Sequence, residues 1–406
     1  MKTPINSSVA TSRRNFLKRG AQTIGGIAIV AMAGGVWQAA DEDIFSPFDG
    51  PAYDPWTTWK TEPLAGPMAL IQSAILASNP HNTQPWRFSV KSDRIDVFAD
   101  RSRHLGAFDP FRREMQIGLG CAIENIVVSA SVHGMNALVE AQPGRFPDKA
   151  ETSGFDLIAT VHLSPGEKRT SELFDAIPLR HTDRSPYQRT KAIPGHLIQK
   201  LADIASEDGL RLDIFDNQKT RLKFDTLMMD ATTAIVADHE MVMASHGWFR
   251  TTDAAIQTHR DGPNLDTAGL SPMMTIAAKI FPDPSPEAGH KMWLDATRDS
   301  HLATAPATAL LSVRDRYGRI DNLSAGRAWQ SMHLFATTKN LSMHPMNQPI
   351  EWADRQLQLG QKPIADQRLT ALVGETGWQP TFAFRMGYKD GPTPPSPRRP
   401  ASDCLV

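Results

Sequence analysis

Three short segments of the chain carry polar side chains whose types and spacing could bind a ligand. The first is residues 78–86, SNPHNTQPW, in which histidine, asparagine, threonine and glutamine stand between two prolines. Amide and hydroxyl groups of this kind can donate and accept hydrogen bonds around a flat polar ligand. The same residue types also satisfy the backbone of an ordinary turn with their own side chains. The spacing leaves a ligand-binding loop and a self-satisfied turn as two open interpretations.

The second segment is residues 180–184, RHTDR, and it could bind a phosphate group. Alternate side chains of an extended chain share one face, so Arg180, Thr182 and Arg184 would point the same way. Two guanidinium forks and a hydroxyl on one face suit a phosphate. A surface stretch that pairs with nearby carboxylates would have the same spacing, and the residues alone favour neither interpretation.

The other charged and reactive residues give weaker signals. The third segment is the tail pair Arg398 and Arg399, which lie between prolines and on their own are typical of a solvated basic tail. Cys121 and Cys404 could form one disulfide, or they could remain a buried thiol and a tail thiol. No CxxC pair, zinc-ligand spacing or H-E-x-x-H motif occurs, so we expect no metal site.

The elements that must position these residues form an α+β pattern that runs twice along the chain. The first pass predicts a helix, two strands, a long helix and two strands, at residues 67–78, 87–90, 94–99, 112–133, 136–140 and 156–163. A second pass starts at Arg180 and predicts a helix from Pro194, a strand, two long helices with a strand between them, and a last strand. Their ranges are 210–215 for the strand, 221–248 and 324–340 for the helices, and 308–313 and 381–386 for the later strands.

Three stretches fall outside this pattern. Residues 41–66 are rich in Asp, Pro and Gly and predict an irregular N-terminal arm. Residues 250–293 break into Pro- and Gly-rich turns around an apolar piece, and we interpret them as an inserted lid. Residues 391–406 form a Pro- and Arg-rich tail, whose first part predicts extended, polyproline-like chain.

Length and composition bound the class of protein. The 406 residues allow two units of about 150–200 residues or one large domain. Hydrophobic residues make up 41% and charged residues 21%, which is a globular composition. The formal net charge of −1 argues against nucleic-acid binding as the main function. Without residues 1–40, 38 basic and 44 acidic residues remain, so the body of the protein is acidic.

Residues 1–40 predict an export leader. Ser12 to Lys18, SRRNFLK, resembles the core of the twin-arginine signal at every position, and an uncharged stretch follows from 21 to 40. An ordinary anchor helix with basic flanks is the alternative. The resemblance implies that the twin-arginine translocation machinery carries the folded protein to the periplasm. Cleavage near Ala40 would release it, and an uncleaved leader would leave it anchored in the membrane.

Four segments together resemble the nitroreductase family of FMN flavoproteins. ILASNPHNTQPWRF resembles the family's asparagine loop between a helix and a strand, and RHTDRSPY resembles its opening arginine motif. NLSMHPMNQP resembles a later loop, and Met386-Gly387-Tyr388 followed by Arg398-Arg399 resembles the closing strand and basic end. These segments span about residues 67–400. The resemblance implies an α+β fold of the nitroreductase type.

The order of the motifs predicts a duplication. In the family the arginine motif precedes the asparagine loop, whereas here it follows by about 100 residues. We therefore expect two tandem copies, repeat 1 at 67–179 and repeat 2 at 180–406. Repeat 1 lacks the arginine motif and repeat 2 lacks the asparagine loop. Family members are dimers whose flavin sites use both subunits, so the fused chain would be an intramolecular pseudo-dimer with one site. This matches the Acg-type branch and implies a monomer.

The resemblance also implies the cofactor, FMN, and the residues that would contact it. Arg180, Thr182 and Arg184 would hold its phosphate and ribityl chain, with added charge from Arg398 or Arg399. The remaining contacts to the ribityl chain or the ring would come from two loops: Pro80, His81, Asn82 and Gln84 in one, and Met346, Asn347 and Gln348 in the other. His181 and Gln348 depart from the family pattern, and a side chain at 348 could crowd the flavin.

Three functions follow from these residues. The first is an exported FMN oxidoreductase that reduces a nitro compound, a quinone or a similar small acceptor through flavin N5. The second is a protein that binds and sequesters FMN under the 250–293 segment with little turnover, which suits a compartment poor in nicotinamide donors. The third is a scaffold that has lost its flavin.

Overall fold

The computed structural model describes residues 48–146, 152–280, 286–374 and 377–406. The predicted leader, residues 1–40, and the first part of the predicted arm lie outside the described residues.

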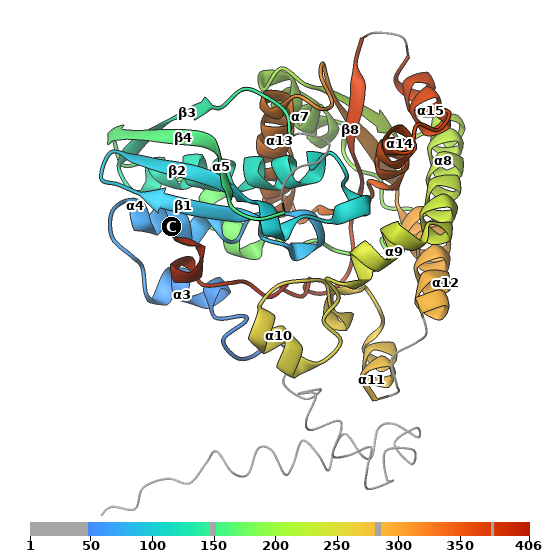
Figure 1. The fold of residues 1–406 in the computed structure, drawn as a ribbon, viewed down its shortest axis with the longest axis horizontal. Coiled ribbons are helices and arrows are strands. Elements are labelled where there is room, and N and C mark those ends of the chain that lie inside the picture. Colours follow the sequence, from blue (N-terminus) through green and yellow to red (C-terminus); the bar gives the residue numbers. More distant parts are fainter. Residues whose placement is uncertain (1–47, 147–151, 281–285, 375–376) are drawn as a thin grey trace, which may run out of the picture.

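Two four-stranded antiparallel sheets form the framework (Figure 1). Their strands are β1 (Trp86–Val90), β2 (Arg94–Asp100), β3 (Met135–Ala141) and β4 (Phe155–Pro165), then β5 (Arg211–Phe215), β6 (Ala307–Val313), β7 (Ser342–Pro345) and β8 (Gln379–Gly387). The first sheet has the order β1-β2-β4-β3 and the second the order β5-β6-β8-β7. The central pair of each sheet carries a register shift, at Val97/Phe98 and at Leu311/Ser312. The two sheets therefore repeat one plan.

The long helices of the two halves pack against each other. Helix α5 (Arg113–Val132) connects β2 to β3, and α13 (Arg319–Thr338) connects β6 to β7. The two helices touch at Gly120 and Gly326, where a Cβ on Gly120 would lie 2.2 Å from the carbonyl oxygen of Leu323. One hydrophobic core extends through both helices and both sheets. The predicted α+β fold is confirmed, and the repeated plan of the two halves is consistent with the predicted tandem copies.

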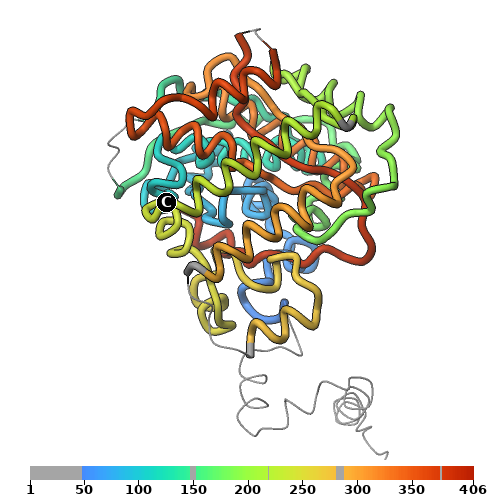
Figure 2. Tube along the Cα trace, turned by 90° about the vertical axis from the view of Figure 1, so that its right-hand side faces the viewer, coloured from blue at the N-terminus to red at the C-terminus, as the bar shows by residue number. Residues whose placement is uncertain are grey.

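The other helices cover the sheets and build the surface of the molecule. They are α3 (Pro55–Thr61), α4 (Pro67–Ala74), α6 (Glu172–Ala176), α7 (Gly195–Glu207), α8 (Gln218–Ala237), α9 (His239–His246), α10 (Asp253–His259), α11 (Pro272–Ile280), α12 (Pro286–Ala296), α14 (Gln348–Gln358) and α15 (Ile364–Val373). Helices α10 and α11 lie at one end of the molecule in both views (Figures 1 and 2). Among the described residues α5 alone is long and apolar enough to cross a membrane, and 78% of that stretch is buried in the fold.

Two expectations about helices were wrong. The single helix expected over 221–248 is two helices, because Asp238 adopts an extended conformation and its carboxylate accepts from the N–H groups of Glu240 and Met241. This N-cap starts α9 and ends α8. The arm expected to be irregular contains α3, which begins at Pro55 and buries Trp56 and Trp59. Proline is favoured in the first turn of a helix.

The C-terminal tail is buried rather than solvated. Arg398 and Arg399 are 2% and 6% exposed. Leu405 forms a parallel bridge with Phe88, so the tail of repeat 2 extends the β1 edge of the first sheet. Cys121 and Cys404 are both buried and unpaired. The interpretation of these arginines as a solvated basic tail is therefore wrong, and the structure has no disulfide between the two cysteines.

Candidate functional site

The loop between α4 and β1 is held in a strained conformation. His81, Asn82 and Gln84 have φ angles of 46°, 51° and 50°, in the left-handed region. Each such non-glycine residue costs about 1–3 kcal/mol, although asparagine tolerates the region better than most. The side chain of Asn79 accepts from the N–H of Gln84 at 2.8 Å, so part of the segment satisfies its own turn. Strain of this kind is common in functional sites.

The arginine segment presents alternate side chains to one cavity. Arg180, Thr182 and Arg184 line it, as the extended chain predicted. His181 and Asp183 turn elsewhere: the His181 ring packs on Trp56, and Asp183 binds Lys389 at 2.5 Å. The segment is therefore anchored by its odd-numbered side chains and offers its even-numbered ones to the cavity.

Arg180 is a buried cation with neutral partners. Its side chain is 2% exposed, and Nη2 donates to the Leu76 carbonyl oxygen at 3.0 Å. Nη1 lies 3.5 Å from Nδ1 of His333, and Nε has no hydrogen-bond partner. Burial lowers the pKa of Arg180 to about 10, so the group is still a cation at neutral pH.

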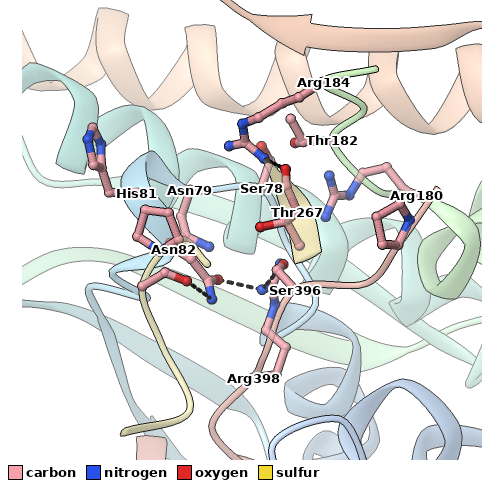
Figure 3. A pocket seen from close by; sticks show the side chains of 13 residues that line it. Ser78, Asn79, His81, Asn82, Arg180, Thr182, Arg184, Thr267, Ser396 and Arg398 are labelled. Carbon is pink, nitrogen blue, oxygen red and sulfur yellow. Dashed lines mark hydrogen bonds between the residues drawn. The ribbon is translucent and has the colours of Figure 1, made fainter. Parts of the chain in front are cut away.

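Arg398 reaches the same cavity from the tail (Figure 3). Its Nη1 donates to Oδ1 of Asn82 and to Oγ of Ser396, and its Nη2 donates to the Ala77 carbonyl oxygen at 3.2 Å. Its Nε has no partner. Burial, together with the nearby charge of Arg180, lowers the pKa of Arg398 well below its usual value.

Three guanidinium groups thus converge on a cavity of about 40 Å³ (Figure 3). Within the part of the chain that the structure describes, no carboxylate lies in ion-pair distance of Arg180, Arg184 or Arg398. Burying an ion without a counter-ion costs several kcal/mol. An anion that takes the free N–H groups of Arg180 and Arg398 would offset that cost. Chemically, the arrangement can accept a phosphate or a similar anion.

The histidines near the cavity add no positive charge. Burial, and then the charge of Arg184, lower the pKa of His81 to about 4. Burial, and then the charges of Arg180 and Arg398, lower the pKa of His181 to about 3. Both are neutral at physiological pH, so the arginines alone supply the charge. No three His, Cys, Asp or Glu side chains of the described ranges gather as a metal ion would require.

A segment that we call the cover segment, residues 250–270, closes the cavity on one side. Its Gly262, Pro263 and Thr267 line the cavity, and Arg184 Nη1 donates to the Thr267 carbonyl oxygen at 3.2 Å. The N–H of Gly262 donates to the carbonyl oxygen of Asn82 at 3.2 Å. Gly269 lies so close to the backbone of Arg184 that a Cβ there would meet its carbonyl oxygen at 2.4 Å.

An ion-pair cluster latches the cover segment to the body. Asp261 is 5% exposed and accepts from Arg250 Nη2 at 2.7 Å and from Arg103 of the first sheet's flank. Gln84 Nε2 donates to the Arg260 carbonyl oxygen at 2.8 Å. The cover segment is therefore fastened to both the loop and the body of repeat 1.

Several residues expected at the site do not line the cavity. Gln84 and Arg399 bind each other, since Arg399 donates from its backbone N–H and its Nη2 to the two oxygens of Gln84. Met346 is buried in the hydrophobic cluster under α14, and Asn347 Oδ1 accepts from the N–H of Ala383 at 2.8 Å. The remaining two, also absent from the lining, are Pro80 and Gln348.

Sequence reasoning missed the lining residues that come from distant segments. They are Gly262, Pro263, Thr267, Pro394 and Ser396. The glycines of the cover segment were a signal of close backbone approach. The site residues that they meet, Asn82 and Arg184, lie far away in the sequence, and no spacing rule connects them.

Comparison with known proteins supports the resemblance. No protein-family model matches the chain. A Mycobacterium tuberculosis protein named "Putative NAD(P)H nitroreductase Rv3131" is 28% identical over 338 residues, which covers 83% of this chain and 90% of the relative. A second, named "Putative NAD(P)H nitroreductase acg", is 25% identical over 353 residues, which covers 82% of this chain and 93% of the relative.

Solved structures give a more distant likeness. A nitroreductase with bound FMN from Desulfitobacterium hafniense is 11% identical and has a TM-score of 0.36, covering 58% of this chain and 97% of that one. The resemblance inferred from the motifs is confirmed by the Mycobacterium relatives, which match most of the described chain. The chain is therefore similar, over most of its length, to the nitroreductase-like proteins of the Acg type.

Proposed function

We propose that the protein is an FMN-dependent oxidoreductase of the nitroreductase type. The observation that carries the proposal is that Arg180, Arg184 and Arg398 line one cavity with the strained loop at residues 79–84. These three cations have no carboxylate partner among the described residues. Relatives that align with 83% of the chain are named as nitroreductases that use NAD(P)H. A nucleotide-like cofactor with a terminal phosphate is the anion that fits both facts.

The donor set fits the phosphate of FMN. The free N–H groups are the Nε atoms of Arg180 and Arg398, both buried on residues that line the cavity, and Thr182 adds a hydroxyl. A guanidinium fork binds phosphate with paired, charge-assisted hydrogen bonds. The cavity of about 40 Å³ has room for roughly three waters or one phosphate group.

The ring of the cofactor needs more space than this cavity. Sites for ligands of such size are typically about 300–1,000 Å³. Binding of the whole cofactor therefore requires the cover segment to move away from the asparagine loop. This requirement supports the interpretation of residues 250–293 as a lid.

When bound, FMN would accept a hydride from a nicotinamide donor and pass electrons to a nitro, quinone or similar acceptor. The protein's own residues would bind, orient and exclude water. The three arginines would hold the phosphate end of the cofactor. His81 and His181 are neutral and add no charge near the phosphate. The N–H of Met346 already donates to the Ala383 carbonyl oxygen, so any donor to the ring from that loop would be the N–H of Asn347 or Gln348.

Export and oligomeric state complete the proposal. The protein is carried by the twin-arginine machinery to the periplasm, where it is free or anchored by its leader. It is a monomer, because the α5–α13 contact already joins the two repeats as a subunit interface would. Fractionation of cells that carry the paired substitution Arg13→Lys with Arg14→Lys tests the route. Loss of the protein from the periplasm is expected, and unchanged export would contradict it.

A second function, sequestration of FMN without turnover, is favoured by the latch on the cover segment. One experiment separates the two. The purified full chain is reconstituted with FMN, and its visible spectrum is followed under anaerobic conditions after NADH or NADPH is added. Bleaching at a catalytic rate supports the oxidoreductase. Bleaching by dithionite alone supports sequestration, and absence of bound flavin would overturn both.

A further inference from the structure

The N-terminal arm places two tryptophans of one helix in different surroundings. Trp56 and Trp59 of α3 are each 8% exposed. Trp59 packs on Phe174, with 5.0 Å between the ring centroids, and Phe174 is not part of the cavity lining. Trp56 instead packs behind the anion site, with its ring centroid 4.9 Å from the guanidinium carbon of Arg398 and 4.5 Å from the ring centroid of His181.

Trp56 contacts two of the segments that form the site. Its Nε1–H donates to the carbonyl oxygen of Ser396 at 2.7 Å, which ties α3 to the tail just before Arg398. Its ring makes a T-shaped contact with the ring of His181, whose neighbours in sequence are Arg180 and Thr182. Figure 1 shows the tail running past α3 before it reaches the β1 edge. One side chain of the arm thus packs on both the arginine segment and the tail.

The backbone of the arm continues this pattern. The N–H of Arg398 donates to the Ala52 carbonyl oxygen at 2.7 Å. The N–H of Ala52 donates to Gln257 Oε1 at 3.0 Å, and Asn264 Nδ2 donates to the hydroxyl of Tyr53 at 3.4 Å. The arm therefore also touches the cover segment. It contacts three cavity-lining segments without lining the cavity itself.

Arg398 needs such support because its position is electrostatically unfavourable. It shares the cavity with Arg180 and Arg184 and has no carboxylate partner among the described residues. The face of an indole ring attracts a guanidinium group, and the attraction increases where water is excluded. Apart from the carbonyl, amide and hydroxyl oxygens around it, the Trp56 ring is the contact among the described residues that favours the charged form of Arg398.

We propose that Trp56 is a positioning residue of the anion site, whose ring holds Arg398 and the arginine segment in place, so that the arm must be docked for the phosphate to bind. The inference rests on the proposed function for the identity of the phosphate ligand. Linkage makes this effect reciprocal. If docking of the arm strengthens anion binding, anion binding strengthens docking of the arm by the same coupling free energy. The arm follows the predicted leader in the sequence, so anion binding would change how firmly that end of the described chain is docked.

The test compares Trp56→Ala, Trp56→Phe and the matched control Trp59→Ala in the full chain. Two probes are used: FMN, followed by flavin fluorescence, and inorganic phosphate, followed by the shift in Tm. Trp56→Ala should weaken both by about tenfold, since a desolvated cation–π contact is of that size. Trp56→Phe keeps a ring face over Arg398 and should stay within about threefold of the wild type. Trp59→Ala should lower Tm but keep wild-type affinity.

Several outcomes would overturn the proposal. Wild-type affinity in Trp56→Ala, or an equal loss in Trp59→Ala, would show that the arm acts only through general stability. If Trp56→Ala fails to fold, amide exchange of residues 52–60 in the wild type replaces it. Saturating phosphate should slow that exchange, and unchanged exchange would refute the linkage. If the wild type binds phosphate but not FMN, the proposed function fails while the phosphate series still tests Trp56. Binding of neither probe refutes both.

Discussion

Gly120 and Gly326 meet at the crossing of α5 and α13, so close that neither position can accept a Cβ without displacing the backbone of the other helix. A Cβ on Gly120 would lie 2.2 Å from the Leu323 carbonyl oxygen, and a Cβ on Gly326 would lie 2.0 Å from that of Ile117. The two glycines occupy corresponding elements of the two repeats. The contact is what allows two copies of one unit to share a single core.

This crossing predicts a strong effect of a single methyl group. Gly120→Ala should lower the free energy of unfolding by about 3 kcal/mol or more, because overpacking against backbone is not relieved by a rotamer change. Gly289 lies inside α12, and a Cβ added there would meet no atom within 4 Å. Gly289→Ala should therefore be neutral or stabilising by up to about 1 kcal/mol. Urea unfolding measures both. Equal effects would contradict the close contact.

The arginine pair predicts loss of ligand without loss of fold. Arg180→Ala with Arg184→Ala should weaken FMN binding by about 100-fold or more, since removing a buried partner of a charged ligand costs about 2–5 kcal/mol. The apo protein should keep its stability, because each substitution removes a cation that lacks a carboxylate partner in the described chain. Equilibrium dialysis and thermal unfolding give the two quantities.

The control for this pair is Arg169→Ala with Arg298→Ala. Their side chains are 70% and 53% exposed, so the net charge changes equally while the cavity is untouched. Equal loss of FMN in the control would mean that long-range charge, rather than the cavity, sets the affinity. Flavin retained by the double variant at 180 and 184 would refute the phosphate assignment.

The local parts of the site could be predicted from sequence, and the convergence could not. The alternation of Arg180, Thr182 and Arg184 follows from an extended backbone, which is a short-range property. Arg398 meets Asn82 across 316 residues, and no periodicity encodes that contact. Arg399 was expected beside the cofactor, yet its hydrogen bonds go to Gln84, because the tail alternates its side chains as it passes the loop.

The same limit applies to the fold. Seven of the eight strands were predicted, since their alternation of apolar residues reflects burial within each strand; β7 (Ser342–Pro345), only four residues long, was missed. The break of the 221–248 helix depends on Asp238 capping α9 and pairing with Arg355, 117 residues away. Helix α3 is short and is held by contacts of Trp56 and Trp59 with distant elements, so a local composition rich in Pro and Gly concealed it.

A buried carboxyl cluster between the repeats predicts a pH effect on stability. Glu114 of α5 hydrogen-bonds Glu351 of α14, and both lie beside Arg113, Asp109 and Asp354. Burial, followed by neighbouring carboxylates, raises the pKa of Asp109 to about 7, and burial also raises the pKa of Glu351 well above its usual value. A raised pKa in the folded state means that the folded protein holds protons that the unfolded chain has released.

These groups therefore stabilise the protein fully below about pH 4, and the contribution is lost as pH rises through the folded pKa values. The histidines of the cavity have lowered pKa values, so their protonation destabilises the folded protein in acid. The test therefore compares the free energy of unfolding of a variant with that of the wild type at each pH. Glu351→Gln should gain stability relative to the wild type between pH 5 and pH 8. Glu167→Gln, whose side chain is 79% exposed, should show no such trend. A pH-independent difference for Glu351→Gln would contradict the raised pKa of Glu351.

The latch on the cover segment predicts how access to the site is controlled. Asp261 is a buried carboxylate between Arg103 and Arg250, so Asp261→Asn leaves two cations with a neutral amide. Breaking a buried ion pair costs about 3–5 kcal/mol, which exceeds what the few remaining contacts of a loop segment supply. Amide exchange over residues 250–268 should accelerate, and FMN should associate and dissociate faster. Asp315→Asn, at an ion pair with 44% and 59% exposed side chains, is the control and should change neither.

If NADH bleaches the flavin faster in Asp261→Asn than in the wild type, the latch limits turnover in an oxidoreductase. If flavin exchange is unchanged, the cover segment does not gate the site. Its hydrogen bonds to Asn82 and Arg184 would then not block the entry of the flavin.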